Sequence, residues 1–194
     1  MNAKNDQKER SYEGILESAS RLVRERGIKG ARVGDVMKGA GLTVGGFYAH
    51  FASKEALVDE TLRRTARRLR AILFARIDDK PASARVEVIL KRYLSAAHRD
   101  DFTFACALPA IASEVGTTAP EYRDVVNELV SELARELENH VPDSAGLPRR
   151  TLALGLVALM VGGLTLSRAL SGTPLSDDVL KACRAVGTFA SRAL

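Results

Sequence analysis

Several side chains that can donate hydrogen bonds to phosphate lie in one short stretch near the N-terminus. They are Thr43, Tyr48, His50 and Lys54. Hydroxyl, imidazole and ammonium groups are donors that proteins use to contact phosphate oxygens. If this stretch forms a helix, the helix N-terminus adds a dipole that also favours an anion. The chemistry indicated here is recognition of a phosphate backbone.

The surrounding residues follow the pattern of a helix, a glycine-containing turn and a second helix. Apolar spacing predicts a short helix over about 33–39, and Gly39 and Gly41 bracket a tight stop. Thr43 is expected to cap a second short helix, over about 43–49, through its hydroxyl group. Together these features are typical of a helix-turn-helix, whose second helix enters the major groove of DNA.

The same stretch resembles the DNA-binding domain of the TetR (AcrR-like) family of bacterial repressors. The resemblance covers roughly the first quarter to third of the chain. It implies that the first turn of the second short helix contacts base edges, and that the Thr, Tyr, His and Lys side chains contact phosphates. The matching residues are Gly27, Val33, Asp35, Val36, Ala40 to Thr43, Gly45, Phe47, Tyr48, His50, Phe51 and Lys54 to Leu57. The predicted DNA-binding residues are Arg32, Thr43, Val44, Gly45, Tyr48, His50 and Lys54.

Two positions depart from the family pattern. Ala31 and Arg32 stand where the family usually has a Thr or Ser that caps the first short helix, and Gly46 lies inside the presumed reading helix. Gly45 and Gly46 would each cost a helix about 1 kcal/mol relative to Ala. We therefore expect a reading helix that is loose when unbound and reads bases through few groups, with Arg32 assisting on phosphate. The nearby Phe47 and Phe51 are expected in the core.

The rest of the pattern predicts an all-α fold of about nine helices, with no convincing β-strand. Gly27 is expected to end the first helix in the left-handed conformation, Ser53 to cap the fourth helix and Ser176 to cap the last. The resemblance implies a helix-turn-helix domain over 1–53 and an effector-binding and dimerisation domain over 54–194. The helices are expected over about 12–26, 33–39, 43–49, 54–78, 82–98, 105–115, 120–140, 151–167 and 176–194, with residues 1–9 frayed.

The composition is that of an ordinary globular protein, with 46% hydrophobic and 27% charged residues. The first ten residues are polar and charged and no apolar segment follows them, so no signal peptide is expected. Two cysteines, Cys106 and Cys183, do not make a secreted disulfide framework. These features indicate a reduced, cytoplasmic chain.

The net charge of +5 is concentrated in residues 61–100, which hold eleven Lys and Arg against four Asp and Glu. Part of this excess is a strip of arginines on the expected fourth helix. The strip could strengthen the field over DNA. The favoured interpretation is a solvated face, or pairs with acidic residues of the C-terminal body. Its members are Arg63, Arg64, Arg67, Arg68 and Arg70.

The segment 151–167 carries no charge and has two interpretations. A membrane span is disfavoured, because seventeen residues are at the short limit for crossing a bilayer and glycines interrupt the run. We favour a buried helix that forms a homodimer interface with the last helix, as the family resemblance implies. The predicted interface residues are Gly155, Ala158, Gly162, Leu166, Val179 and Val186.

Cys106 allows either a reactive or an inert thiol. A reactive thiol needs cationic neighbours that favour the thiolate, and the local sequence is apolar, so an inert core cysteine is the default. No tight ligand spacing such as Cys-x-x-Cys occurs, so neither a metal nor a cofactor is expected. No nucleophile, base and orienting group come together, so no enzyme is expected. The alternative is an enzyme or ligand carrier that uses Cys106 and has a vestigial DNA-binding head.

The C-terminal part also supplies apolar and aromatic residues that could line a cavity for a small apolar or aromatic effector. The expected function is a cytoplasmic, homodimeric DNA-binding regulator, released by that effector from a palindromic operator in double-stranded DNA. The mechanism that the resemblance implies is a population shift in the spacing of two reading heads. The predicted effector-binding residues are Tyr93, Phe102, Phe104, Cys106, Leu108, Tyr122 and Met160.

Overall fold

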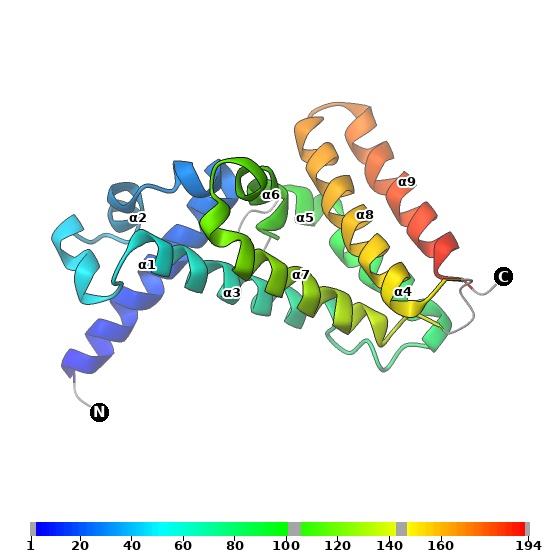
Figure 1. The fold of residues 1–194 in the computed structure, drawn as a ribbon, viewed down its shortest axis with the longest axis horizontal. Coiled ribbons are helices and arrows are strands. Elements are labelled where there is room, and N and C mark those ends of the chain that lie inside the picture. Colours follow the sequence, from blue (N-terminus) through cyan, green and yellow to red (C-terminus); the bar gives the residue numbers. More distant parts are fainter. Residues whose placement is uncertain (1–2, 101–105, 143–146, 193–194) are drawn as a thin grey trace. The chain divides into compact units, whose positions relative to one another are not determined.

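The computed structural model describes residues 3–100, 106–142 and 147–192. These residues form nine α-helices and two 3-10 helices and contain no strand, so the all-α prediction is confirmed (Figure 1). The elements are α1 (Ala3–Gly30), α2 (Val33–Gly39), η1 (Val44–Ala49), α3 (Lys54–Leu73), α4 (Ala82–Tyr93), α5 (Ala96–Asp100), α6 (Leu108–Thr117), η2 (Pro120–Tyr122), α7 (Arg123–Glu138), α8 (Arg149–Ala169) and α9 (Pro174–Ala190).

The chain divides into two compact units. The first unit contains residues 1–66 and 106–126, and the second contains residues 67–105 and 127–194. This division differs from the predicted ranges, because α6 packs on α1 and so belongs with the N-terminal helices. The separation of 1–53 from 54–194 by function stays a prediction.

The core of the first unit is built by the apolar stripe of α1. Ile15 and Leu16 have almost no exposed surface, and Val36 and Met37 from α2 are fully buried as well. Helix α1 begins well before the predicted residue 12, because its first turns are rich in Lys, Gln and Glu, which are good helix formers. The predicted range of 12–26 therefore placed the start of this helix too late.

Two predicted helix signals are confirmed in this unit. Gly27 has a φ of 72°, which is the left-handed region, although α1 resumes for one further turn to Gly30. The Ser53 hydroxyl accepts a hydrogen bond from the Ala56 N–H at 3.2 Å and so caps α3. The third signal, in the second unit, is wrong, since α9 begins at Pro174 and not at Ser176.

Ser176 lies inside α9 and is buried against α8. Its hydroxyl donates to the Ser167 carbonyl oxygen at 2.6 Å, and the Ser167 hydroxyl donates to the Ser176 carbonyl oxygen at 2.9 Å. This reciprocal pair ties the beginning of α9 to the end of α8. The side chain predicted to cap a helix therefore joins two helices.

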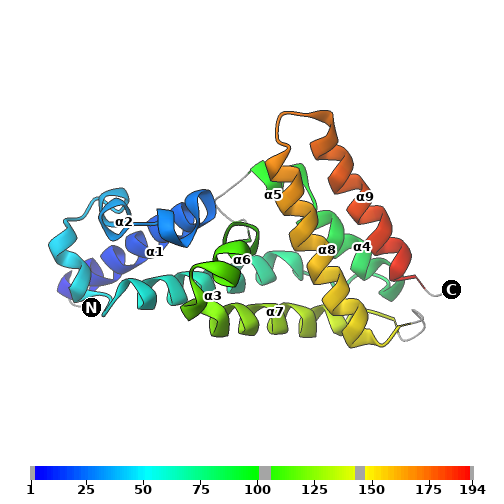
Figure 2. The ribbon, with the colours of Figure 1, turned by 45° about the horizontal axis from the view of Figure 1, so that its top comes forward.

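Helices α8 and α9 lie side by side in both ribbon views (Figures 1 and 2). Glycines allow their close approach at two points. A Cβ atom on Gly163 would lie 2.8 Å from the Cys183 Sγ, and one on Gly187 would lie 3.0 Å from the Leu159 Cδ2. Any larger side chain at these two glycines would push the helices apart.

Two other predicted helices are shorter or divided. The predicted helix 54–78 ends at Leu73, shortly before Arg76 adopts a φ of 51°. The predicted helix 82–98 is broken near Leu94, after which the Ser95 hydroxyl accepts from the His98 N–H at 3.1 Å and starts α5. Both breaks come from local backbone geometry that apolar spacing does not reveal.

Candidate nucleic-acid interface

The predicted reading helix is the 3-10 helix η1 and not an α-helix. Thr43 precedes it in an extended conformation, and its hydroxyl makes no capping hydrogen bond, so that prediction is wrong. The Gly46 N–H instead donates to the Thr43 carbonyl oxygen at 3.1 Å. The adjacent Gly45 and Gly46 explain the difference, because glycine favours the α-helix poorly and short 3-10 turns replace it readily.

The inward face of η1 is fixed by aromatic packing. Phe47 is 1% exposed and stacks on Phe51, with ring centroids 5.9 Å apart. Phe51 stacks in turn on Tyr12 of α1, with ring centroids 5.1 Å apart. Both phenylalanines are therefore core residues, as predicted, and η1 is fixed to α1 through them.

The opposite face of η1 points to solvent. Val44 is 54% exposed and Tyr48 is 77% exposed, and Thr43 and Gly45 are exposed as well. The Tyr48 ring rests with its edge against Phe47, at 5.2 Å between centroids, which leaves its hydroxyl free to reach outward. The structure thus leaves four of the predicted DNA-binding residues, in or next to η1, exposed to solvent.

His50 lies at the end of η1 and is half-buried. Its Nδ1 atom is inaccessible to solvent and has no hydrogen-bond partner among the described residues. An open pocket of about 390 Å³ lies beside it, lined also by Asn5, Lys8 and Tyr12 of α1. Asn5, Lys8 and Glu9, which also line this pocket, belong to α1, although residues 1–9 were predicted to be frayed.

Arg32 and Lys54 take different positions. Arg32 is exposed at the start of α2, where it makes no side-chain cap, in keeping with its departure from the family pattern. Lys54 is half-buried, and its ammonium group donates to the Ile28 carbonyl oxygen at 2.9 Å. Lys54 therefore binds the end of α1, and its predicted contact with phosphate stays a prediction.

The arginine strip is largely paired with carboxylates. Arg63 contacts Asp59 at 2.8 Å and Arg64 forms an ion pair with Glu13. In the second unit, Arg70 pairs with Glu132 and lies 3.3 Å from Glu136. Arg70 therefore pairs with acidic residues of the body, as the favoured interpretation expected, whereas Arg64 pairs with α1 of the N-terminal head and Arg63 with its own helix.

The predicted effector residues are divided between the two units. Tyr93 and Met160 are fully buried in the second unit, and the Tyr93 ring meets His98 edge-on at 4.6 Å between centroids. In the first unit Cys106 is 4% exposed, and burial raises the pKa of Tyr122 to about 12. The remaining residues of the prediction are Leu108, which is buried in the first unit, and Phe102 and Phe104, which lie outside the described residues.

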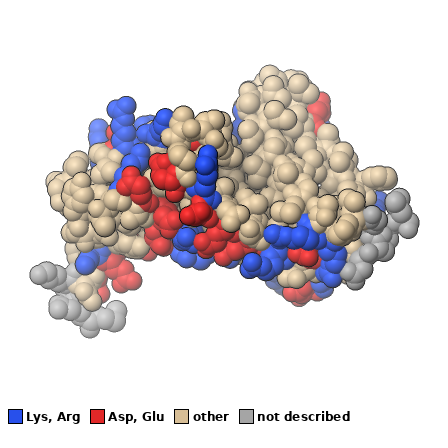
Figure 3. All heavy atoms as spheres, viewed as in Figure 1, with Lys and Arg blue, Asp and Glu red and all other residues tan. Residues whose placement is uncertain are grey.

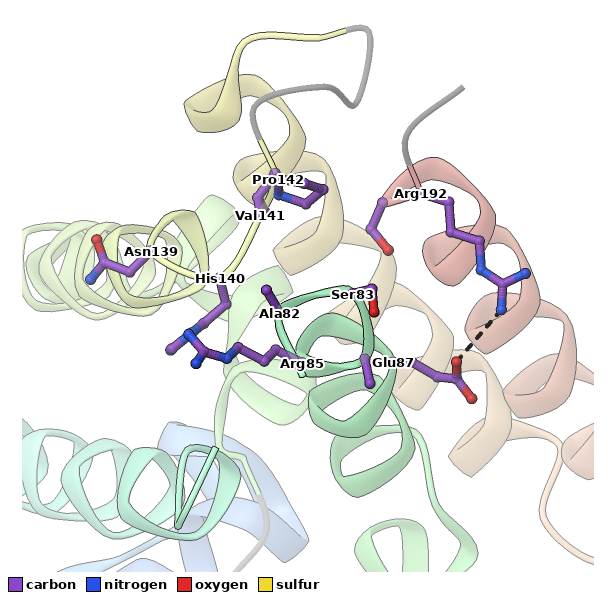
Figure 4. Close-up of a pocket in the computed structure, with 11 residues that line it drawn as sticks. Ala82, Ser83, Arg85, Glu87, Asn139, His140, Val141, Pro142 and Arg192 are labelled. Atoms are coloured by element: carbon purple, nitrogen blue, oxygen red, sulfur yellow. Dashed lines mark ion pairs between the residues drawn. The ribbon is translucent and has the colours of Figure 1, made fainter. Parts of the chain in front are cut away.

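A pocket of about 740 Å³ in the second unit contains none of these residues (Figure 4). It is bordered by the beginning of α4, by the chain after α7 and by the residues that follow α9, with Arg85, His140 and Arg192 among its lining residues. Arg192 faces Glu87 at 3.7 Å, and His140 stacks on Phe74 with ring centroids 5.6 Å apart. Polar and apolar residues from three separate segments line this pocket. The sequence therefore showed no apolar pattern that would have predicted it.

The predicted dimer residues lie mostly on the open face of α8 and α9. Leu166 is 56% and Val186 is 57% exposed, and a Cβ atom on Gly155 or Gly162 would meet nothing within 4 Å. Ala158 is exposed as well and Val179 is half-buried. Figure 3 shows few charged atoms over α8 and α9 on the face it presents.

Helix α8 is also long and apolar enough to cross a membrane by length and composition. In this structure 44% of its most apolar stretch is buried. Within the described part of the chain, no group of three or more His, Cys, Asp or Glu side chains is placed to hold a metal ion.

Comparison with known proteins identifies the N-terminal region. Residues 15–61 match the model described as bacterial regulatory proteins, tetR family. The HTH-type transcriptional repressor KstR2 of Mycobacterium tuberculosis (strain ATCC 25618 / H37Rv) is 49% identical over 49 residues, which are 25% of this chain and 24% of KstR2. The chain therefore matches about a quarter of the length of that relative.

Two similarities extend over most of the chain. The HTH-type transcriptional regulator BetI of Escherichia coli O157:H7 is 27% identical over 174 residues, or 85% of each chain. A TetR transcriptional regulator from Chloroflexus aurantiacus has the same fold, with a TM-score of 0.80 at 20% identity over 94% of both chains. The fold and the exposed face of η1 thus define an all-α helix-turn-helix protein. Its N-terminal region, residues 15–61, thus resembles bacterial regulatory proteins of the tetR family.

Proposed function

We propose that this protein is a DNA-binding transcriptional regulator that acts in the cytoplasm as a repressor. The observation that carries the proposal is the exposed face of η1, where Thr43, Val44 and Tyr48 face solvent while Phe47 anchors the element in the core. An exposed second helix on a buried anchor is the geometry with which a helix-turn-helix enters the major groove. The match of residues 15–61 to the tetR model supports the same reading.

The proposed DNA-binding form is a homodimer on a palindromic operator. The open face of α8 and α9 supports this part, because Leu154, Leu166 and Val186 are large apolar side chains left more than 40% exposed. Contiguous exposed apolar surface of this kind marks interaction sites. A second copy of the same face would cover it, and two reading heads would then meet two half-sites about one helical turn of DNA apart.

The proposed signal is a small apolar or aromatic effector bound in the C-terminal part of the chain. The family supports this proposal, and so does the aromatic and sulfur content of the predicted residues. The burial of Cys106 supports an inert thiol rather than an electrophile sensor, because reactive cysteines are partly exposed and near cations. Effector binding would shift the population away from the operator-bound conformation.

The proposal is tested by selecting operator sequences from random double-stranded DNA with the purified protein. We expect the selected sequences to be palindromic and to bind as one dimer per duplex, with an affinity that falls steeply as salt rises. The matched control is a shuffled duplex of the same length, which should bind far more weakly. Equal binding to selected and shuffled duplexes would contradict a sequence-specific regulator.

A further inference from the structure

The corner between α1 and α2 is held by an acidic residue from a distant part of the sequence. Glu114, in α6, accepts hydrogen bonds from two consecutive backbone N–H groups, those of Ile28 at 3.1 Å and Lys29 at 3.0 Å. These two N–H groups follow Gly27, where the backbone leaves the helical conformation. All of these residues belong to the first unit.

The geometry is that of a helix cap supplied by another element. Gly27 interrupts α1, and its carbonyl oxygen accepts from the Ala31 N–H at 3.2 Å, so a new turn begins at this glycine. A side chain at the first position of a helix usually accepts from the N–H groups of the first turn. Gly27 has no side chain, and the Glu114 carboxylate takes that place.

The fit between Gly27 and the carboxylate is close. A Cβ atom on Gly27 would lie only 1.6 Å from the Glu114 Oε1, so even alanine could not coexist with this arrangement. The Gly27 backbone, at φ 72° and ψ −177°, is also a conformation that is essentially restricted to glycine. The missing side chain therefore makes room for the carboxylate as well as permitting the turn.

A second charged residue, of the opposite sign, binds the same corner. The Lys54 ammonium group, at the start of α3, donates to the Ile28 carbonyl oxygen at 2.9 Å. The N–H groups of the corner are thus bound by an anion and one of its carbonyl groups by a cation. Charge-assisted bonds of this kind are stronger than neutral ones, and the chain continues from this corner directly into Arg32 and α2.

We propose that Glu114 is a positioning residue for the DNA-binding surface. Its carboxylate connects α6 to the corner that sets the direction of α2, so that a change in α6 changes the presentation of Arg32 and η1. This inference rests on the proposed function for its consequence on DNA. The contacts at Ile28 and Lys29 can be measured without DNA.

The test compares Glu114→Gln with wild type. Gln keeps the shape of the side chain but has one acceptor oxygen and no charge, so one of the two N–H groups loses its partner. We expect amide hydrogen exchange at Ile28 and Lys29 to become about tenfold faster, and the amide resonances of α2 to shift. We also expect the affinity for the selected operator to fall about tenfold at a temperature well below unfolding.

The matched control is Glu121→Gln, which removes the same charge from the exposed neighbouring element η2. It should leave the exchange rates and operator affinity at their wild-type values. Glu114→Asp, whose shorter side chain keeps the charge but loses reach, should behave like Glu114→Gln. Together these variants test whether both the charge and the reach of the Glu114 side chain are needed.

The inference would be overturned if Glu114→Gln left the exchange at Ile28 and Lys29 unchanged. It would also be overturned if the variant lowered only the melting temperature and kept full operator affinity, since a purely structural role predicts that result. If wild-type protein bound no selected duplex, the proposed function would fail instead. The amide measurements would then still decide whether Glu114 holds the corner.

Discussion

Tyr48 is the single side chain that best represents the proposed interface. Its ring packs edge-on against the buried Phe47, while 77% of the residue remains exposed. The ring is therefore held in place and its hydroxyl is available to a ligand. A phenol group in such a position can donate to a phosphate oxygen without reorganisation of the side chain.

We predict that Tyr48→Phe weakens binding to the selected operator and to shuffled DNA by the same factor. One lost neutral hydrogen bond corresponds to about 1 kcal/mol, or roughly a fivefold loss of affinity. Fluorescence anisotropy with both duplexes measures the effect, and the melting temperature should not change. A loss confined to the selected operator would instead assign the hydroxyl to a base edge.

His140 allows a prediction about pH. Burial lowers the pKa of this histidine most. Smaller effects come from Asp78, which raises the pKa, and from Arg85, which lowers it further. The unfolded chain, with a histidine pKa of about 6.5, therefore binds this proton more readily than the folded protein. We expect the free energy of unfolding to fall as the pH drops through about 6.5.

The contribution of His140 is isolated by comparing wild type with His140→Phe in urea titrations between pH 7.5 and 5.5. Phenylalanine retains the aromatic contact with Phe74 and cannot titrate. The wild type should lose more stability than the variant over this interval. Identical pH dependences would show that this histidine does not contribute to the acid sensitivity.

At the scale of the elements, the sequence predicted those helix caps and helix ends that depend only on neighbouring residues. Gly27 and Ser53 act where expected, because a left-handed glycine and a serine cap depend on their immediate neighbours. Thr43 and Ser176 do not act as caps. Ser176 meets a partner, Ser167, in another helix, and adjacent glycines turn η1 into a 3-10 helix.

The candidate site shows the same limit. Phe47 was predicted in the core from its apolar character, and Tyr48 on the interface from the family resemblance of this stretch. The partners Glu114 and Lys54 of the α1–α2 corner could not be predicted. Their contacts join residues more than twenty positions apart, and no spacing rule within one element reports such a pairing.

Two consecutive glycines of α8 provide a matched prediction. Gly163 faces α9, where a Cβ atom would lie 2.8 Å from the Cys183 Sγ and 3.1 Å from the Leu94 Cδ2. Gly162 faces open space, with nothing within 4 Å. Gly163→Ala should lower the free energy of unfolding by about 1–3 kcal/mol, as overpacked cores do.

Gly162→Ala should instead leave the free energy of unfolding unchanged or raise it by up to about 1 kcal/mol, because alanine is the better helix former. Urea unfolding of the two variants under identical conditions provides the comparison. Equal effects of both substitutions would mean that the two glycines do not differ in their packing.

At the scale of the whole molecule, the main question is how two copies associate. The open face of α8 and α9 combines small residues, such as Gly162, with exposed Leu166 and Val186. Small residues let two helices approach closely, and the apolar side chains beside them supply the buried area. The proposed homodimer would cover this face.

We predict that Gly162→Leu prevents dimerisation, because its side chain would hold the two copies apart. Sedimentation should show a monomer, and operator binding should be lost since one head alone makes too few contacts. Gly116→Leu adds the same side chain at an exposed glycine of α6 and should remain dimeric. A dimeric Gly162→Leu protein would place the interface elsewhere.

The corner at Gly27 also has a consequence for how this sequence can diverge. The space that a side chain at position 27 would fill is occupied by the Glu114 carboxylate. A descendant of this protein that replaced the glycine would therefore have to move, shorten or remove the acid at 114. We therefore expect positions 27 and 114 to change together. The same carboxylate accepts from the N–H groups of Ile28 and Lys29, which lie eighty-six and eighty-five residues before it in the sequence.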